Sequence, residues 1–248
     1  MTTPATLYAP SPKASLPHRA LDRIFFGVMS LVILAIVFFG FARTYFLAGT
    51  VHAPLPNLLI HIHGAVFTLW IVLFLVQTAL IATHNVRIHR RLGIGGFTLA
   101  CCMIVLGVLA AVDAMRRGSG PLGLDAKSFF IIPMSDMLLF AIFIAASFRA
   151  RRRPEAHKRL ILIATIALTD AAVGRWPIAL FQHHPPTQDI VPLLLLLMIA
   201  AFDLTTLRRL SRSTLWAGAL LMAVHLTRVP IGLSHAWHTF ADFMLRTV

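Results

Sequence analysis

The strongest constraint on this chain is a series of long apolar stretches. Its 248 residues are 58% hydrophobic and 12% charged, and a soluble domain would carry about twice that charged fraction. A bilayer-spanning helix needs about 20 mostly apolar residues. Several stretches meet this requirement, and they lie at roughly 24–42, 58–82, 93–114, 129–148, 160–180, 190–207 and 214–232. The sequence therefore predicts an all-α, polytopic membrane helix bundle with seven transmembrane helices.

The remaining segments divide the chain into three expected parts. Residues 1–20 contain several prolines and are expected to form a flexible cytoplasmic tail. Residues 21–232 form the seven-helix transmembrane domain, and residues 233–248 form an external C-terminal tail. The first apolar stretch is longer than a signal-peptide core of about 7–15 residues, so we expect it to be retained as a helix.

The basic residues indicate the orientation of the chain. The net charge of +13 is spread over short loops, which argues against a nucleic-acid binder. Cytoplasmic loops of membrane proteins are rich in Lys and Arg. This rule predicts an inner-membrane protein with a cytoplasmic N-terminus, an external C-terminus and basic loops that contact anionic lipid headgroups. No protein partner can be inferred. The predicted cytoplasmic segments contain Lys13, Arg19, Arg23, Arg87, Arg90, Arg91, Arg149, Arg151, Arg152, Arg153, Lys158, Arg159, Arg208, Arg209 and Arg212.

A polar stripe runs along the second apolar stretch. His63, Trp70, Gln77 and His84 recur at seven-residue intervals, and seven residues return a helical side chain to within about 20° of its starting direction. Lipid offers these groups no hydrogen-bond partners, so the stripe is expected to face the protein interior. Trp70, at mid-span, is interpreted as a packing residue.

Several polar residues of different predicted spans lie at a similar depth, toward the external side of the membrane, and we call them the outer layer. An unpaired charge costs several kcal/mol at membrane depth, so these groups should pair inside the bundle. Three interpretations remain open: a structural network, a metal or haem site, and a proton or substrate path. His63, His225, Asp136 and Asp170 are the candidate ligands. The outer layer comprises His61, His63, Asp113, Asp136, Asp170, Arg175, His225 and Arg228.

A second, inner layer contains Gln77, His84, His89 and His157. His89 and His157 occupy equivalent positions at the starts of the third and fifth spans. Each could be an interfacial histidine that binds a phosphate or caps a helix. As a pair on two helices, they could also be the axial ligands of one haem.

Several short motifs in the middle of the chain resemble those of known membrane-protein families. His61-x-His63-Gly64, Gln77, His89-Arg90-Arg91-Leu92-Gly93 and His157-Lys158-Arg159-Leu160 resemble an uncharacterised family of bacterial multi-pass inner-membrane proteins. The chain is more distantly similar to the b561-type haem-binding membrane cytochromes. That similarity implies interior histidine pairs on paired helices near each membrane face. Asp136 stands where a second outer histidine would be needed, which is a departure from that pattern.

Other chemistries are excluded or less well supported. Every lysine lies outside the predicted spans, which excludes a retinal Schiff base, and no phosphate loop or nucleophile elbow occurs. The leading interpretation is a redox or metal-binding membrane protein that holds haem b or a transition metal between helices. The alternatives are a metal-free structural or assembly protein, a proton-coupled transporter, and a zinc-dependent membrane hydrolase. The sequence does not decide whether the protein is an enzyme.

Overall fold

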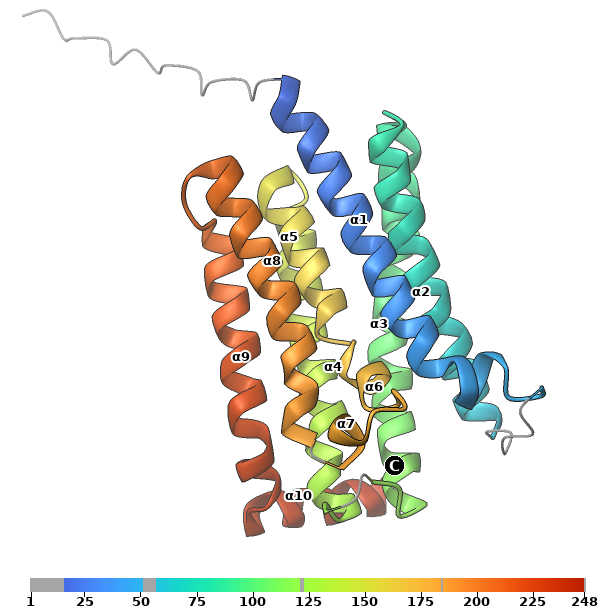
Figure 1. Cartoon of the computed structure of the whole chain (residues 1–248). Helices are drawn as coiled ribbons and strands as arrows, with labels where there is room; N and C mark the ends of the chain where they lie inside the picture. Colours follow the sequence, from blue (N-terminus) through green and yellow to red (C-terminus); the bar gives the residue numbers. More distant parts are fainter. Residues whose placement is uncertain (1–15, 51–56, 121–122, 184, 248) are drawn as a thin grey trace, which may run out of the picture.

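The computed structural model describes residues 16–50, 57–120, 123–183 and 185–247. This part of the chain is helical and contains no strand. Figure 1 shows the long helices side by side, alternating in direction, with α1 beginning at the upper end and α10 lying at the lower end. The elements are α1 (Leu16–Phe41), the π-helical turn η1 (Ala42–Phe46), α2 (Leu58–Ala82), α3 (Val86–Arg116), α4 (Ala126–Arg149), α5 (Pro154–Ile166), α6 (Asp170–Val173), α7 (Ala179–His183), the 3₁₀ turn η2 (Pro185–Asp189), α8 (Ile190–Leu207), α9 (Arg212–Gly232) and α10 (His235–Thr247).

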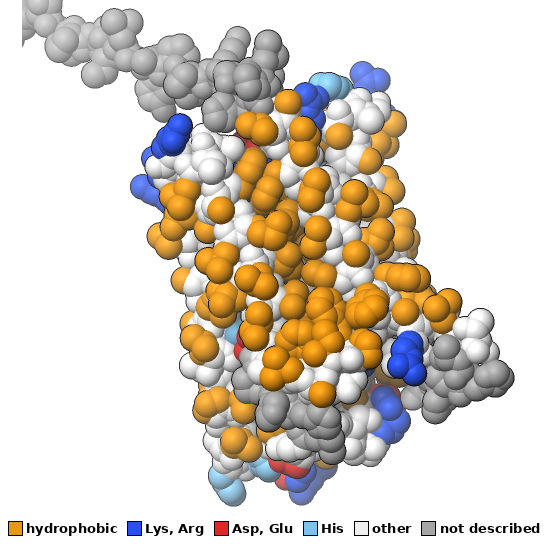
Figure 2. Space-filling model, viewed as in Figure 1, with side chains coloured by type: hydrophobic (Ala, Val, Ile, Leu, Met, Phe, Trp, Pro, Cys, Tyr) orange, Lys and Arg blue, Asp and Glu red, His pale blue; other side chains and the backbone are white. Residues whose placement is uncertain are grey.

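Six helices of the described chain are long and apolar enough to cross a membrane. Hydrophobic side chains cover the visible face between the two ends, whereas Lys and Arg side chains gather at the ends (Figure 2). This distribution is that of a multi-pass membrane protein. The six segments are Ala20–Phe46, Leu58–Ala82, Val86–Arg116, Ala126–Arg149, Thr187–Leu207 and Arg212–Gly232.

The fifth predicted span, residues 160–180, is not a single helix. Helix α5 ends at Ile166 and the chain resumes as the single turn α6 at Asp170. The Thr165 hydroxyl donates to the Ile161 carbonyl (2.9 Å) and the Thr169 hydroxyl to the Ile166 carbonyl (2.7 Å). Such bonds compete with the helical pattern and bend helices. The prediction of seven continuous helices therefore becomes six long helices and one interrupted segment.

The terminal segments can be compared only in part with the predicted tails. Residues 1–15 lie outside the described residues, and residues 16–20 already belong to α1. At the other end, most of the expected tail 233–248 forms the helix α10.

Helix α10 is attached to the start of α4. The Trp237 indole donates to the Lys127 carbonyl (2.8 Å), and the His238 ring lies 3.0 Å from the Ser128 hydroxyl. Lys127 also pairs with Asp242 (2.6 Å). These contacts hold α10 across the lower end of the bundle, where Figure 1 shows it.

Close backbone packing fixes the position of the interrupted segment. A Cβ atom added to Gly40 on α1 would overlap the carbonyl group of Ala172 on α6. Gly27 on the same helix has no heavy atom near such a Cβ. Helix α1 can therefore lie directly against α6 only because residue 40 has no side chain.

This contrast gives a matched pair of substitutions. Gly40→Ala should destabilise the protein by about 1–3 kcal/mol, because two backbones must separate. Gly27→Ala should be neutral or stabilise by up to about 1 kcal/mol, because alanine is the better helix former. Thermal unfolding in detergent checks both values. Equal effects of the two substitutions would show that the Gly40 contact is not tight.

The attachment of α10 should be sensitive to acid. The Ser128 hydroxyl lowers the pKa of Asp125, and the Lys127 ammonium group lowers the pKa of Asp242. A lowered carboxyl pKa stabilises the fold above the usual Asp value of about 3.9, and this stabilisation is lost as the pH falls through the folded-state pKa. Trp237 emission, taken as the difference between wild type and Trp237→Phe, should therefore shift below about pH 4. Emission that is unchanged down to pH 2.5 would contradict this prediction.

Candidate functional site

Three acidic residues, one histidine and one arginine converge in the lower half of the bundle. Asp136 comes from α4, Asp170 is the first residue of α6, and Asp189 ends η2. His225 and Arg228 lie three residues apart on α9, so they share one helical face. All of these side chains are buried except Asp189, which is 14% exposed. We call these five residues the acidic cluster.

Arg228 lies at the centre of the acidic cluster. Its Nη1 atom lies 3.0 Å from Asp136, and its Nη2 atom lies 2.5 Å from both Asp170 and Asp189. The planar guanidinium group has five N–H donors and no acceptor. A single arginine side chain thus joins α4, α6, η2 and α9.

His225 occupies the space beside the guanidinium group. Its Nδ1 atom lies 3.0 Å from an oxygen of Asp189 and 3.7 Å from an oxygen of Asp170. The Nε2 atom of His225 and the Oδ1 atom of Asp170 are buried without a hydrogen-bond partner. Ligand atoms of Asp136, Asp170 and His225 lie within 4.8 Å of one another. Two of the three residues with the spacing of a cation site therefore carry buried polar atoms without a hydrogen-bond partner.

The charges of the acidic cluster do not balance. With His225 neutral, three carboxylates face one guanidinium group, which leaves a formal charge of −2 (3 − 1 = 2 excess negative charges). Burying unpaired charge costs several kcal/mol. Two positive charges are needed to neutralise the acidic cluster. They could come from a divalent cation, from protons on two carboxylates, or from one carboxylate proton together with a protonated His225.

The helix break explains how Asp170 reaches this site. In one continuous α-helix, Asp170 and Arg175 would be separated by five residues and could not easily face each other. In the structure, Asp170 instead points to α9, while Arg175 donates to the Ala171 carbonyl (2.5 Å) and lies 4.7 Å above the Phe41 ring. The predicted outer layer is thereby divided, with Arg175 outside the acidic cluster.

A second buried ion-pair network lies toward the upper end of the bundle. Arg159 on α5 pairs with Asp203 on α8 (2.5 Å) and with Glu155 (2.6 Å). The Thr214 hydroxyl and the Ser211 backbone N–H donate to the other oxygen of Asp203, at 2.6 and 3.0 Å. Asp203 is thus fully paired, and this network joins α5, α8 and α9.

Sequence reasoning missed three of these residues. It assigned Arg159 to a basic loop and made no assignment for Asp203 or Asp189. Asp203 is the sole acidic residue of its apolar stretch, and a charge at membrane depth usually has a partner. That signal could have identified Asp203, whereas Arg159 and Asp189 carry no comparable signal.

The predicted ligand His63 does not join the acidic cluster. Its ring packs against Phe67, with centroids 4.0 Å apart, and its Nδ1 atom is buried without a partner. His61 is exposed, and its carbonyl accepts a hydrogen bond from Tyr45 (3.0 Å). Asp113 accepts from Asn57 (3.0 Å) and pairs with Arg117 (2.9 Å). These residues form separate local contacts at the ends of α2 and α3.

The polar stripe predicted for the second apolar stretch is only partly on one helix: Trp70 and Gln77 lie on α2, whereas His84 lies beyond the end of α2 at Ala82 and has a left-handed backbone (φ 63°). The Trp70 indole is buried and donates to the Thr165 hydroxyl (3.3 Å). Gln77 donates to the His89 carbonyl (3.3 Å), and His84 lies 2.7 Å from an Arg23 nitrogen. The stripe thus joins α2 to α1, α3 and α5 and forms no single site.

His89 and His157 lie next to each other. Their ring centroids are 6.4 Å apart and their planes are nearly perpendicular. The Nδ1 atom of His157 lies 2.8 Å from the Ser147 hydroxyl and 3.0 Å from the Ser147 carbonyl. A hydrogen bond at one ring nitrogen is typical of histidines that ligate a metal through the other. The inner pair therefore has the donor atoms for a haem iron, whereas the acidic cluster, with one imidazole, does not suit two axial histidines.

Comparisons with family models, curated proteins and solved structures gave no match for this chain. The assignment of a function therefore depends on the geometry described above.

The central position of Arg228 can be tested by substitution. Arg228→Met should destabilise the protein by about 3–5 kcal/mol, because it leaves buried carboxylates without a counter-charge. Arg175→Met is the matched control and should cost much less, since Arg175 pairs with a carbonyl and an aromatic ring. Combining Arg228→Met with Asp136→Asn should recover part of the loss. Strict additivity in thermal unfolding would contradict the direct pairing of Arg228 with Asp136.

Proposed function

We propose that the chain is a multi-pass inner-membrane protein that binds a divalent transition-metal cation in the acidic cluster. Asp136, Asp170 and His225 supply the ligands, and Arg228 with Asp189 orients them. The observation that carries this proposal is the convergence of three buried residues with metal-ligand atoms, in a cluster that has an excess of negative charge. Two of these residues, Asp170 and His225, also carry polar atoms without hydrogen-bond partners. A divalent cation would balance that charge.

The proposed topology has seven crossings. The interrupted segment from α5 to η2 runs along the bundle beside the long helices (Figure 1) and would make the fifth crossing. Non-helical backbone is tolerated at membrane depth where it is buried in protein or lines a cavity. The N-terminus would then be cytoplasmic and the C-terminus external, as the basic loops indicate. Ion sites beside broken membrane helices are a recurring arrangement in transporters.

The donor set limits the choice of cation. One imidazole and two carboxylates suit zinc, iron(II) or manganese(II). Three protein ligands leave coordination positions for water or substrate. Iron would support a redox role, and zinc would act as a Lewis acid in a hydrolase. The identity of the metal thus separates the two enzymatic alternatives.

Elemental analysis of the purified protein tests the proposal. Wild type from metal-replete cells should contain about one equivalent of a single transition metal. His225→Ala and Asp170→Asn should lose it, whereas His63→Ala should keep it, because His63 lies outside the acidic cluster. Re-adding the metal at about 100 times its dissociation constant should raise the stability of wild type and His63→Ala by about 2.7 kcal/mol and leave that of His225→Ala and Asp170→Asn unchanged.

Two results would overturn this assignment. Metal at background level together with unfolding temperatures that no divalent metal raises would leave protons as the charges that balance the acidic cluster. The proton-coupled transport alternative would then be favoured, and solute movement in vesicles should depend on a pH gradient. Equal metal retention by His225→Ala and wild type would place any bound metal elsewhere.

Haem at the inner pair is a second candidate, favoured by the contact between His89 and His157 and by the Ser147 bond to His157. It predicts a strong visible absorption band that His157→Ala removes and His225→Ala leaves intact. A colourless sample from haem-replete cells would exclude this site without affecting the proposal for the acidic cluster.

A further inference from the structure

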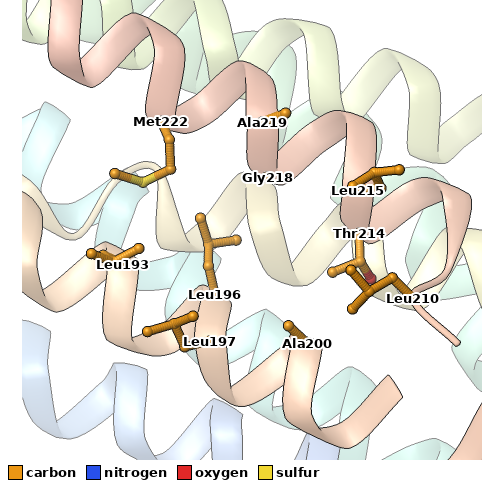
Figure 3. Close-up of a pocket in the computed structure, with 10 residues that line it drawn as sticks. All are labelled: Leu193, Leu196, Leu197, Ala200, Leu210, Thr214, Leu215, Gly218, Ala219 and Met222. Atoms are coloured by element: carbon orange, nitrogen blue, oxygen red, sulfur yellow. The ribbon is translucent and has the colours of Figure 1, made fainter. Parts of the chain in front are cut away.

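An open apolar groove lies between α8 and α9. Its volume is about 260 Å³. Figure 3 shows Leu196 of α8 pointing toward Gly218 of α9, which has no side chain. Thr214 is the polar lining residue, and its hydroxyl already donates to Asp203 (2.6 Å). The groove is lined by Leu193, Leu196, Leu197, Ala200, Leu210, Thr214, Leu215, Gly218, Ala219 and Met222.

The groove extends from the α8–α9 turn along both helices, to Leu193 near the start of α8 and to Met222 on α9. On α9 its lining begins near Leu210, in the turn, and ends at Met222. A helical rise of about 1.5 Å per residue gives this wall a length of about 18 Å. One leaflet of the hydrocarbon core is about 15 Å thick, half of about 30 Å. The α9 wall of the groove is therefore about as long as one leaflet is thick.

Three exposed arginines lie close in sequence to Leu210, at the end of the groove that we call its mouth. Arg208, Arg209 and Arg212 lie in or beside the α8–α9 turn, and Leu210, a lining residue, stands between them. Arg208 has a left-handed backbone conformation (φ 56°), which ends α8 abruptly and keeps the turn short. The nearest buried carboxylate, Asp203, is neutralised by Arg159 (2.5 Å). The mouth is therefore strongly basic, while the groove below it is apolar.

We infer that this groove binds one acyl chain of an anionic phospholipid, whose phosphate contacts the three arginines. Guanidinium groups suit phosphate because they offer parallel N–H donors. Each Lys or Arg near an anionic membrane surface contributes about 1 kcal/mol. A neighbouring helix would also find apolar surface here, but it would not explain the three cations at the mouth. This inference is independent of the metal site.

Native mass spectrometry of the purified full-length protein in mild detergent tests the inference. With phosphatidylglycerol or phosphatidylcholine added, wild type should retain one phosphatidylglycerol and bind it about tenfold more tightly than phosphatidylcholine. Gly218→Leu should weaken retention at least about tenfold by filling the groove. Gly218→Ala is the matched control and should bind normally, since its Cβ would lie 3.7 Å from Leu196, an ordinary contact.

Charge substitutions test the headgroup contact separately. Replacing Arg208, Arg209 and Arg212 together by alanine should abolish the preference for phosphatidylglycerol. The same replacement of Arg151, Arg152 and Arg153, in the α4–α5 turn, should preserve it. If Gly218→Leu does not fold, Ala219→Leu fills the same groove from an exposed position.

Either of two results would overturn the inference. The first is retention of phosphatidylglycerol by Gly218→Leu or Ala219→Leu at the wild-type level. The second is a lipid-free, cross-linkable dimer of wild type that Gly218→Leu abolishes, which would identify a second copy as the occupant.

Discussion

The pairing of Arg228 with three carboxylates is the interaction on which the arrangement of the lower bundle depends. Without it, Asp136, Asp170 and Asp189 would carry like charges at close range in a buried region, which is strongly unfavourable. The guanidinium group offers enough donors to contact all three. Because the carboxylates come from separate segments, one side chain determines how α4, α6 and η2 meet α9.

The interruption after Ile166 makes this pairing possible. A continuous helix would orient residue 170 by the regular 100° step, independently of what it needs to contact. The turn at residues 167–169 releases that constraint and allows Asp170 to face Arg228. The contact of Gly40 with Ala172 then holds the short helix α6 in place from the other side. The break in the helix thus allows Asp170 to pair with Arg228.

Hydropathy predicted most of the fold, because backbone groups in lipid must pair within their own segment and this requires long apolar helices. It did not predict the break within residues 160–180, because the average hydropathy of a stretch is insensitive to the two threonines, Thr165 and Thr169, whose hydroxyl groups bond to the backbone there. For the acidic cluster, the sequence predicted which residues are buried and polar but not which of them lie together. Asp136, Asp170, His225 and Arg228 were identified as buried polar groups, but their convergence, and the exclusion of His63 and Arg175, depends on helix order. Asp189 lies in a short connection where hydropathy carries no information.

The two buried ion-pair networks also constrain the order in which the chain can be assembled during synthesis. Arg159 and Asp170 both belong to the interrupted segment, whereas their partners Asp203 and Arg228 lie on α8 and α9. The ribosome therefore makes the interrupted segment well before its counter-charges exist. Asp170 then has no cationic partner, which disfavours stable insertion of the segment into lipid alone, whereas Arg159 already pairs with Glu155 (2.6 Å). The pairing of Asp170 is completed only when α9 has been made, so the C-terminal third of the chain determines how the middle finally packs.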